Sequence, residues 1–595
     1  MNGTAKTRAL ITCFSLAGCF TAFSFRLVQL QVTQHDEYAA RAAEKHVNRQ
    51  TIYARRGTIQ DAHGESLAQN EPVKTVVVDG TLMKDRAEMA DVLSEMLKLP
   101  KAPLVERLAR EVYSHSLKKQ APSPYIVIKK EVPESVIADL VERLAERKMR
   151  GVFFEQGSTR VYPNGKMLCH VLGYVNGEDA GVEGVERTME QFLRGHDGFR
   201  YIERDRTGKE IVPYRGQEKD ARNGCNVRLT IDMGLQNIVE MELDAAVKQF
   251  KPKSITVILM QPKTGEILAM ANRPNFNLNV QDNVPPDHRR NRAITDRVEP
   301  GSTFKIVTTA AALTERIVRP STMIFCENGY FSWCKLHDHR GYADLSVNDI
   351  LVHSSNIGVA KLAIQLGDQK FYEYVRRFGF GERTAVNLPG EVGGTVHPPH
   401  TWNKISITRM PMGQEVDATP LQITTAMCAI ANGGHLMMPQ IIREITDGQG
   451  KVITSFPPQE VRQVASKSAT DAVRSALIEV VGPKGTAALA HVVGFNVAGK
   501  TGTAQKYDEK THLASHDRYV VSFLGFMPAE DPAFVGLVLL DEAQVPHDKN
   551  YGGLVAAPIF SHIGERAARY LGLVPSPEIP AGSVVAGQTT HFHDQ

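Results

Sequence analysis

The sequence predicts an α+β protein with a single N-terminal transmembrane helix, a mixed α/β region after it, and a larger domain of helices and strands. Three observations support this fold class. One long uncharged apolar run exists, from Ala9 to Phe25. Segments typical of short strands and of amphipathic helices then follow one another up to about residue 225. From residue 226 to about residue 573, helical and strand-like segments alternate.

Composition limits the class of protein. Of the 595 residues, 42% are hydrophobic and 23% are charged, which is typical of globular proteins. Lys and Arg total 69 and Asp and Glu total 66, so the net charge is +3. This near-balance argues against a nucleic-acid-binding protein, which usually carries a strong basic excess. Seven cysteines are too few for a disulfide scaffold, and a single apolar run excludes a polytopic membrane protein.

Residues 1–30 are predicted to hold a cytoplasmic tip and a transmembrane anchor. The run Ala9–Phe25 lies at the short end of what spans a bilayer. Lys6 and Arg8 precede it and Arg26 follows, which predicts a cytoplasmic N-terminus and an extracytoplasmic, periplasmic remainder in a single-pass cell-membrane protein. A cleavable signal peptide is the alternative. The run is longer than the usual apolar region of such a peptide, and no small-x-small site follows it directly.

Residues 31–225 are predicted to form a second domain. The expected elements are a helical stretch over 35–49, short strands over 54–61 and 63–68 around an Asp-x-x-Gly turn, a strand over 74–80, two helices within 85–113 separated near Pro100 and Pro103, and an amphipathic helix over 133–148.

Residues 226–573 are predicted to form the third domain. It opens with a strand over 227–231 and a helix over 235–250. Residues 255–260 and 267–270 then read as a hairpin with a tight turn at Gly265. Residues 574–595 are rich in Pro, Gly and polar residues, so we expect a flexible tail there.

Three short motifs in the third domain carry the chemistry. They are Ser302-Thr303-Phe304-Lys305, Ser354-Ser355-Asn356 and Lys500-Thr501-Gly502-Thr503. A Ser-x-x-Lys alone occurs by chance in many chains of this length. The three motifs together, in this order, match the set of penicillin-recognising serine enzymes.

The residue types explain the expected chemistry. Pro300-Gly301 precedes Ser302 and an apolar helix follows, so Ser302 is predicted near a helix N-terminus, where free N–H groups favour an oxyanion. Lys305 lies three residues later on the same face and is expected to reach the Ser302 hydroxyl. Burial and nearby cations would lower the pKa of such a lysine and let it accept the serine proton. Lys500 and Ser354 are the expected neighbours.

The third motif is predicted on an edge strand beside the nucleophile, with residues 520–526 as the next strand. Lys500 and the hydroxyls of Thr501 and Thr503 suit a terminal carboxylate. Gly502 is expected to let a substrate backbone approach closely. Asn356 offers an amide that would orient a substrate peptide.

On these motifs the chain resembles the class B penicillin-binding proteins, which are peptidoglycan D,D-transpeptidases. The resemblance implies an elongated pedestal (penicillin-binding protein dimerisation-like) domain and a transpeptidase domain with a five-stranded antiparallel sheet flanked by helices. It also implies acylation of the serine with release of terminal D-Ala, attack by an amine of a second stem peptide, and covalent binding of β-lactams. Carried over residue by residue, Ser302, Lys305, Ser354 and Lys500 are catalytic, and Asn356, Thr501, Gly502 and Thr503 bind substrate. The oxyanion hole would be the N–H groups of Ser302 and Thr503.

The resemblance covers most of the chain. Matching segments are 56–68, 160–165, 170–175, 184–186, 413–415, 419–422, 551–553 and 557–560. We interpret those before residue 225 as structural, with buried Arg–Glu pairing as their explanation.

The second motif ends in Asn356, which resembles the division-type, FtsI-like branch and implies a role in septal wall synthesis. Partners would then be a membrane glycosyltransferase of the FtsW and RodA class and other divisome proteins. Three alternatives stay open. They are an elongation-type transpeptidase, a non-catalytic division scaffold, and a β-lactam sensor or β-lactamase on the same fold.

No cofactor or metal is expected. Cys326 and Cys334 allow a disulfide, and together with His337 and His339 they could bind zinc. The spacing does not match that of similar elongation-type proteins with a metal near this region, so plain loop residues are the simpler interpretation. The basic cluster Arg289–Arg292 is interpreted as a solvated face, with contact to an anionic surface as the alternative.

Overall fold

The computed structural model describes residues 3–36, 47–114, 119–203, 218–508 and 513–576. The chain divides into two compact units. One combines Met1–Arg55 with Gly195–Gly224, and the other combines Arg56–Arg194 with Cys225–Gln595.

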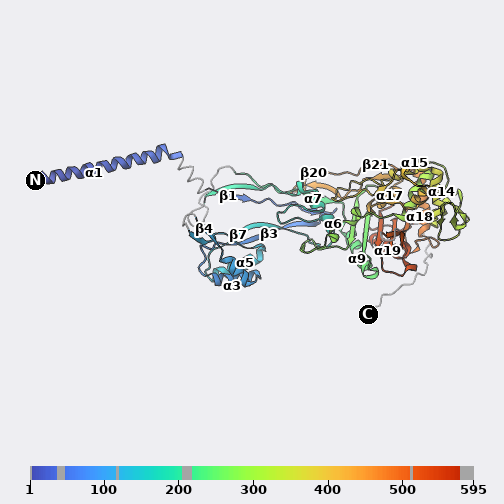
Figure 1. Cartoon of the computed structure of the whole chain (residues 1–595), viewed down its shortest axis with the longest axis horizontal. Coiled ribbons are helices and arrows are strands. Elements are labelled where there is room, and N and C mark those ends of the chain that lie inside the picture. The colour runs from blue at the N-terminus through green and yellow to red at the C-terminus, as the bar shows by residue number, and fades with distance from the viewer. Residues whose placement is uncertain (1–2, 37–46, 115–118, 204–217, 509–512, 577–595) are drawn as a thin grey trace. The chain divides into compact units, whose positions relative to one another are not determined.

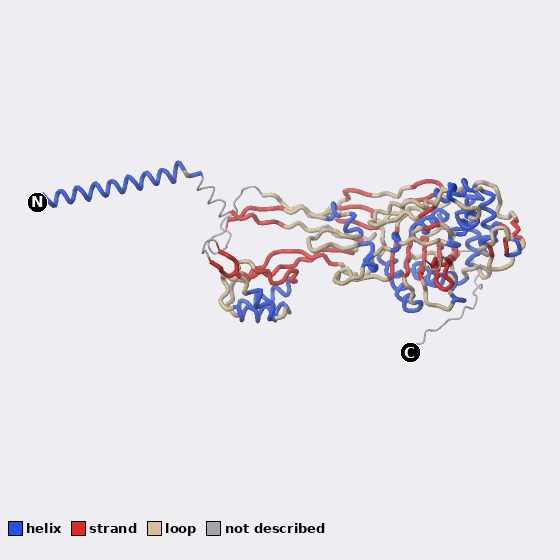
Figure 2. The backbone as a smooth tube through the Cα atoms, viewed as in Figure 1, coloured by secondary structure: helices blue, strands red, loops and turns tan. Residues whose placement is uncertain are grey.

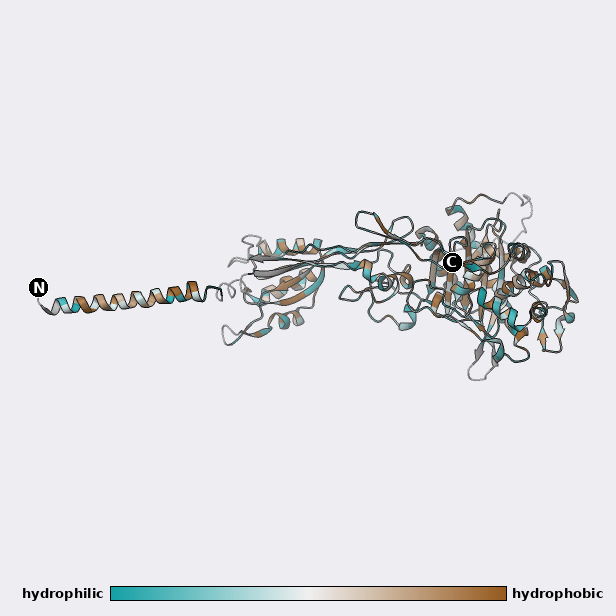
Figure 3. Cartoon of the chain, turned by 90° about the horizontal axis from the view of Figure 1, so that it is seen from above, coloured by the Kyte–Doolittle hydropathy of each residue, from teal (hydrophilic) through white to brown (hydrophobic). Residues whose placement is uncertain are grey.

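The first unit contains the apolar helix α1 (Gly3–Val28), which continues into the π-helical turn η1 (Gln29–Thr33). Residues Lys6–Thr33 are long and apolar enough to cross a membrane, and α1 is largely brown in the hydropathy colouring of Figure 3. The hydroxyls of Thr12 and Thr21 donate to carbonyls four residues earlier, at 2.9 and 2.8 Å. Their polar groups are therefore satisfied within the helix, as a lipid environment requires.

The other element of this unit is an antiparallel strand pair, β1 (Val47–Ile52) with β8 (Gly198–Glu203). The helical stretch predicted over 35–49 falls mainly on residues 37–46, outside the described residues. Its last three residues lie in β1, so the prediction is wrong there. Pairing with β8, distant in sequence, overrides a local helical composition.

The N-terminal part of the second unit is built on a seven-stranded sheet. Its strands are β20 (Val452–Ser455), β19 (Ile442–Thr446), β9 (Asn226–Leu229), β2 (Ile59–Gln60), β3 (Ser66–Val78), β6 (Ile126–Pro133) and β7 (Val152–Val161), with β7 paired to β3. The turn predicted near residues 61–64 is present, and the predicted strands are confirmed in part. Of the strand predicted over 54–61, only Ile59–Gln60 forms, as β2. The strands predicted over 63–68 and 74–80 are one strand, β3, which begins at Ser66 and ends at Val78.

Three helices pack on this sheet through a separate apolar cluster that includes Leu93 and Leu140. They are α3 (Arg86–Leu97), α4 (Lys101–Leu108) and α5 (Glu134–Glu146). Asp85 caps α3 by accepting from two backbone N–H groups. The second predicted helix ends at Leu108 rather than near Tyr113, because Glu111–Ser114 forms strand β4, which pairs with β5 (Lys119–Pro122).

A buried ion-pair network confirms the interpretation of the N-terminal motifs. Glu186, in α7 (Gly184–Thr188), binds Arg56 at 2.8 Å and Arg160 at 2.7 Å, and all three side chains are almost fully buried. Arg56 also pairs with Glu190 at 2.6 Å. Two guanidinium groups thus share a carboxylate between segments far apart in sequence.

The C-terminal part of the second unit contains a five-stranded antiparallel sheet in the order β11-β10-β24-β23-β22, which confirms the expected sheet. The strands are β10 (Ser254–Met260), β11 (Ile267–Arg273), β22 (Ala498–Asp508), β23 (Leu513–Met527) and β24 (Phe534–Asp541). The predicted hairpin is β10–β11, and β22 is an edge strand as predicted.

Helices cover both faces of this sheet, as Figures 1 and 2 show. Gly536 of β24 faces α19 (Gly552–Tyr570), because a Cβ there would lie 2.8 Å from the ring of Phe560. Leu539 has the opposite parity and lines a cavity with Pro420 of α17 (Pro420–Ala431). Helix α9 (Met233–Phe250) packs beside α19.

Shorter elements complete the second unit. They are α6 (Cys169–Leu172), α8 (Glu190–Leu193), α10 (Pro286–Arg289), α11 (Arg292–Thr295), α15 (Asp368–Arg377), α16 (Ser406–Arg409), α18 (Lys467–Val481), β12 (Met323–Phe325), β13 (Tyr330–Phe331), β14 (Leu336–His337), β15 (Asp344–Ser346), β16 (Thr395–Val396), β17 (Val416–Asp417), β18 (His435–Met437) and β21 (Glu460–Gln463).

The basic cluster at residues 289–292 is a solvated face only in part, since Arg290 is exposed but Arg292 is not. Arg292 is only 6% exposed and pairs with Asp287 and Asp296. Arg290 pairs with the same two carboxylates, and Arg289 donates to the hydroxyl of Tyr174 at 2.6 Å. Local acidic residues neutralise the cluster, which the run of arginines alone does not reveal. The predicted tail at 574–595 falls almost entirely outside the described residues.

Candidate active site

Ser302 lies in the 3-10 turn η2 (Gly301–Phe304), which leads directly into α12 (Lys305–Thr314). This agrees with the predicted position near a helix start. Gly301 has φ +58° and Gly413 has φ +81°, and a Cβ on Gly413 would overlap the Gly301 backbone. Gly413 is therefore required for this close approach, and the left-handed backbone of Gly301 favours glycine there. Within the described part of the chain, the Ser302 hydroxyl makes no hydrogen bond, so it is free to face the cavity.

Lys305 is fully buried behind the nucleophile. Its Nζ donates to the carbonyl of Ser354 at 2.6 Å, to the Ser354 hydroxyl at 3.1 Å and to Asn356 Oδ1 at 2.7 Å. Burial lowers the pKa of Lys305 well below its usual value, and the positive charge of Lys500 adds to this effect. Sequence reasoning expected contact with Ser302, but the Nζ atom of Lys305 lies against three acceptor atoms of the second motif instead.

The second motif lies between α13 (Val347–Val352) and α14 (Asn356–Leu366). Ser354 occupies the left-handed region at φ +57°, which turns its carbonyl and hydroxyl toward Lys305. Ser355 is the N-cap of α14 and accepts from the N–H of Gly358 at 2.9 Å. The motif is therefore a tight inter-helix turn with a built-in cap.

Asp338 fixes this turn, and sequence reasoning missed it. Its carboxylate accepts from the Ser355 hydroxyl at 2.6 Å and from the N–H groups of Asn356 and Ile357 at 2.5 and 3.1 Å. Its negative charge also opposes the lowering of the Lys305 pKa. The available sequence signal was a single acidic residue between His337 and His339, eighteen residues before the start of α14. The neighbouring Cys and His residues suggested a metal site instead.

The third motif lies on β22, at the edge of the sheet and against η2. Lys500 is fully buried, and burial lowers its pKa to about 7. The Thr501 hydroxyl lies 3.2 Å from that of Thr486, and the Thr503 hydroxyl accepts from the N–H of Gly552 at 3.3 Å.

Gly502 also has a structural role in addition to the predicted approach of a substrate backbone. A Cβ at this position would overlap the Ser522 hydroxyl and lie 3.1 Å from Thr303 Cγ2 and 3.2 Å from the Pro300 carbonyl oxygen. The glycine therefore lets β22 approach the nucleophile turn and its neighbouring strand, whether or not a substrate is bound.

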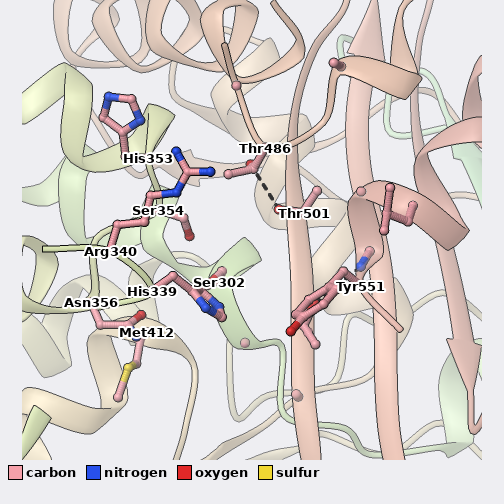
Figure 4. A pocket seen from close by; sticks show the side chains of 18 of the residues that line it. Ser302, His339, Arg340, His353, Ser354, Asn356, Met412, Thr486, Thr501 and Tyr551 are labelled. Carbon is pink, nitrogen blue, oxygen red and sulfur yellow. Dashed lines mark hydrogen bonds between the residues drawn. The ribbon is translucent and has the colours of Figure 1, made fainter. Parts of the chain in front are cut away.

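The three motifs line one cavity of ≈ 650 Å³. Figure 4 shows Ser302 between the segment that carries Ser354 and Asn356 and the strand that carries Thr501. Thr503 lines the same cavity, while Lys305, Lys500 and Gly502 lie behind its wall. All predicted site residues are thus brought together in or directly behind one cleft.

The side chains of Cys326, Cys334, His337 and His339 make packing contacts. Cys326 and Cys334 are buried free thiols. The His337 ring stacks on Tyr330 at 4.5 Å, and that of His339 meets Tyr551 edge-on at 6.1 Å. Among the described residues, no group of three or more His, Cys, Asp or Glu side chains is placed to hold a metal ion.

This arrangement is that of an active-serine acyltransferase. It has a serine at a helix start (Ser302), a buried lysine of lowered pKa in the next turn (Lys305) and a second lysine on the adjacent edge strand (Lys500). Residues 255–565 match the penicillin binding protein transpeptidase domain, and residues 51–229 match the penicillin-binding protein dimerisation domain.

Relatives match over nearly the whole chain. Stage V sporulation protein D of Bacillus subtilis (strain 168) is 31% identical, over 96% of this chain and 87% of its own length. Peptidoglycan D,D-transpeptidase FtsI of Escherichia coli (strain K12) is 30% identical, over 94% of this chain and 92% of its own. The crystal structure of penicillin binding protein 2X from Streptococcus thermophilus is similar, with a TM-score of 0.72 at 25% identity, covering 88% of this chain and 80% of that one. The chain belongs to the class B penicillin-binding proteins.

Proposed function

We propose that this protein is a peptidoglycan D,D-transpeptidase that cross-links stem peptides through an acyl-enzyme on Ser302. The observation that carries the proposal is the convergence of the three motifs on one cavity backed by two buried lysines. The names and full-length similarity of the relatives support the same reaction.

In the acylation step, the Ser302 oxygen attacks the carbonyl carbon between the two terminal D-Ala residues. Lys305, neutral because of its lowered pKa, accepts the hydroxyl proton. Ser354, within hydrogen-bond reach of Lys305, passes a proton to the departing amine of the terminal D-Ala. The C–N bond breaks, D-Ala leaves, and an ester of Ser302 remains.

In the transfer step, the amine of a second stem peptide attacks this ester. A new amide bond forms, the Ser302 oxygen leaves, and the proton of the attacking amine returns to it through the same two groups. Throughout, the N–H groups of Ser302 and Thr503 would stabilise the oxyanion.

Four residues would bind substrate. The hydroxyls of Thr501 and Thr503 would bind the terminal carboxylate, and Lys500 would attract it through its charge from behind the cavity wall. Asn356 would orient the peptide. Gly502 serves indirectly, by letting the strand lie close to the nucleophile. Penicillins would acylate the same serine and remain bound.

We propose the following organisation. Residues 1–30 anchor the chain with its N-terminus in the cytoplasm, residues 31–225 form the pedestal, residues 226–573 form the extracytoplasmic transpeptidase domain, and residues 574–595 form a tail. The anchor and pedestal would contact a membrane glycosyltransferase of the FtsW and RodA class. Asn356, at which the second motif resembles the division-type branch, supports a role in septal rather than lateral wall synthesis.

The experiment replaces the chromosomal copy in the source organism with Ser302→Ala under depletion of the wild type. We expect normal amounts of the variant, loss of cross-linking at the septum and filamentous cells. Rounded cells would instead assign the enzyme to elongation. Normal division with the variant would contradict the catalytic proposal and leave a scaffold.

A further inference from the structure

A short hairpin beside the catalytic cleft carries aromatic rings that are exposed to solvent. We call residues 330–337 the aromatic hairpin. Its strands β13 and β14 pair Tyr330 with His337, and Trp333 lies in the turn between them. Trp333 is 57% exposed and Tyr330 is 46% exposed. Single exposed rings are ordinary, but a cluster of them marks an interaction surface.

The rings of the aromatic hairpin form two pairs. Those of Tyr330 and His337 stack with their centroids 4.5 Å apart. The ring of Trp333 lies against that of Phe331, at 5.7 Å. Within the described part of the chain, no hydrogen bond involves the Tyr330 hydroxyl, the Trp333 indole N–H or the His337 ring nitrogens. The hairpin therefore offers apolar ring faces together with polar groups that a ligand can bond.

The opposite face of the aromatic hairpin is fixed to the protein. Leu336 and Cys334 are buried, and Arg409 donates to the Cys334 carbonyl at 2.8 Å. The Lys361 ammonium lies 5.0 Å from the centre of the Phe331 ring. The exposed rings are thus held in position before a ligand arrives, which lowers the entropy cost of binding.

The aromatic hairpin is continuous with the catalytic cleft. The carbonyl of His337 accepts from Asn356 Nδ2 at 3.0 Å, and the same side chain accepts from Lys305. Two residues beyond His337, His339 lines the cavity, and its ring meets that of Tyr551 edge-on. Figure 4 shows both of these rings in the cavity wall. A ligand chain that leaves the cleft on this side would therefore meet the exposed rings.

A polysaccharide chain has the chemistry that this surface would recognise. A pyranose ring presents an apolar face of C–H groups that packs on an aromatic ring, while its hydroxyl and N-acetyl groups form hydrogen bonds at the ring edge. In peptidoglycan, the stem peptides are branches of a chain of N-acetylated sugars. When a stem peptide lies in the cleft, that chain must lie near the mouth of the cleft.

We propose that the aromatic hairpin binds the glycan backbone of peptidoglycan by stacking of its N-acetylated sugar rings on Trp333 and Tyr330. The inference rests on the proposed function, because it takes the cleft as the site of the stem peptides. Binding of the glycan raises the effective concentration of its stem peptides at Ser302. The hairpin therefore acts on polymeric substrates and leaves the acylation of Ser302 by small molecules unchanged.

The test is isothermal titration calorimetry of the full-length protein in phosphatidylglycerol nanodiscs with chito-oligosaccharide, a peptide-free chain of β-linked N-acetylglucosamine. Trp333→Ala should weaken binding by about tenfold, the contribution of a well-stacked ring. Trp333→Phe keeps a ring and should retain most of the affinity. Phe153→Ala is the matched control, because it removes a ring that is 50% exposed on β7, and it should bind like the wild type. Melting temperatures show whether each variant is folded.

Absence of binding to the wild type, or equal affinity of the wild type and Trp333→Ala, would overturn the inference. Protection of Trp333 from acrylamide quenching in nanodiscs without sugar would assign the hairpin to the lipid surface and overturn it as well. Fluorescent penicillin contains no sugar, so it should acylate the wild type and Trp333→Ala at the same rate. Failure of the wild type to react with penicillin would instead count against the proposed function, which keeps the two failures distinguishable.

Discussion

Replacing Asp338 by Asn tests how the second motif is held. The carboxylate accepts three hydrogen bonds, one from a buried hydroxyl and two from the first N–H groups of α14. An amide offers one acceptor oxygen and turns an NH₂ group toward these donors. Because hydrogen bonds to charged groups contribute about 1.5–3 kcal/mol and neutral ones about 1, we expect a loss of about 2 kcal/mol. If this loss falls on the positioning of Ser354 and Asn356, penicillin acylation slows by about 30-fold.

The assay is the second-order rate constant of acylation by fluorescent penicillin as a function of pH. Acylation requires neutral Lys305, so the rate falls on the acid side as this amine becomes protonated. The Asp338 charge raises the Lys305 pKa, against burial and Lys500. Its removal lowers that pKa further, so the acid limb should move to lower pH. A merely structural defect would reduce the rate without moving the limb.

Asp344→Asn is the matched control, because this carboxylate is exposed on the neighbouring strand β15. It should acylate like the wild type. The reasoning is refuted if Asp338→Asn acylates at the wild-type rate with an unchanged pH profile.

Three further variants test other parts of the structure. Gly502→Ala should lower the free energy of unfolding in denaturant by about 1–3 kcal/mol and abolish penicillin labelling. Adding Ser522→Ala should restore part of the stability and part of the labelling, because it removes the hydroxyl that the new Cβ would overlap most. No rescue would contradict the packing explanation. Glu186→Gln should cost about 3–5 kcal/mol because it leaves two buried arginines without their shared carboxylate; an unchanged melting temperature would disprove this. Lys500→Met should move the acid limb of residual acylation to higher pH, because Lys305 loses a neighbouring positive charge; a limb that stays in place would exclude this coupling.

The residues that do the chemistry could be predicted because their signals are local. Ser302 follows a Pro-Gly pair and precedes an apolar helix, so its position at a helix start is encoded within a dozen residues. The edge strand predicted at the third motif and the next strand predicted over 520–526 likewise form, as β22 and β23.

What could not be predicted depends on contacts between distant segments. Asp338 is recognisable only once β14 is folded against the start of α14. The strand character of Val47–Ile52 comes from pairing with β8, about 150 residues later. The reason for Gly502 lies in Ser522 and Pro300, which a reading of the motif alone does not bring near it.

The most direct test of the proposed acyl-enzyme is mass spectrometry of the full-length protein after exposure to penicillin. We expect one stable adduct of intact penicillin mass, mapped by proteolysis to the peptide that contains Ser302 and absent from Ser302→Ala. An adduct on another residue, or labelling that persists in Ser302→Ala, would contradict the assignment of the nucleophile. Rapid loss of the adduct with release of hydrolysed penicillin would instead indicate a β-lactamase.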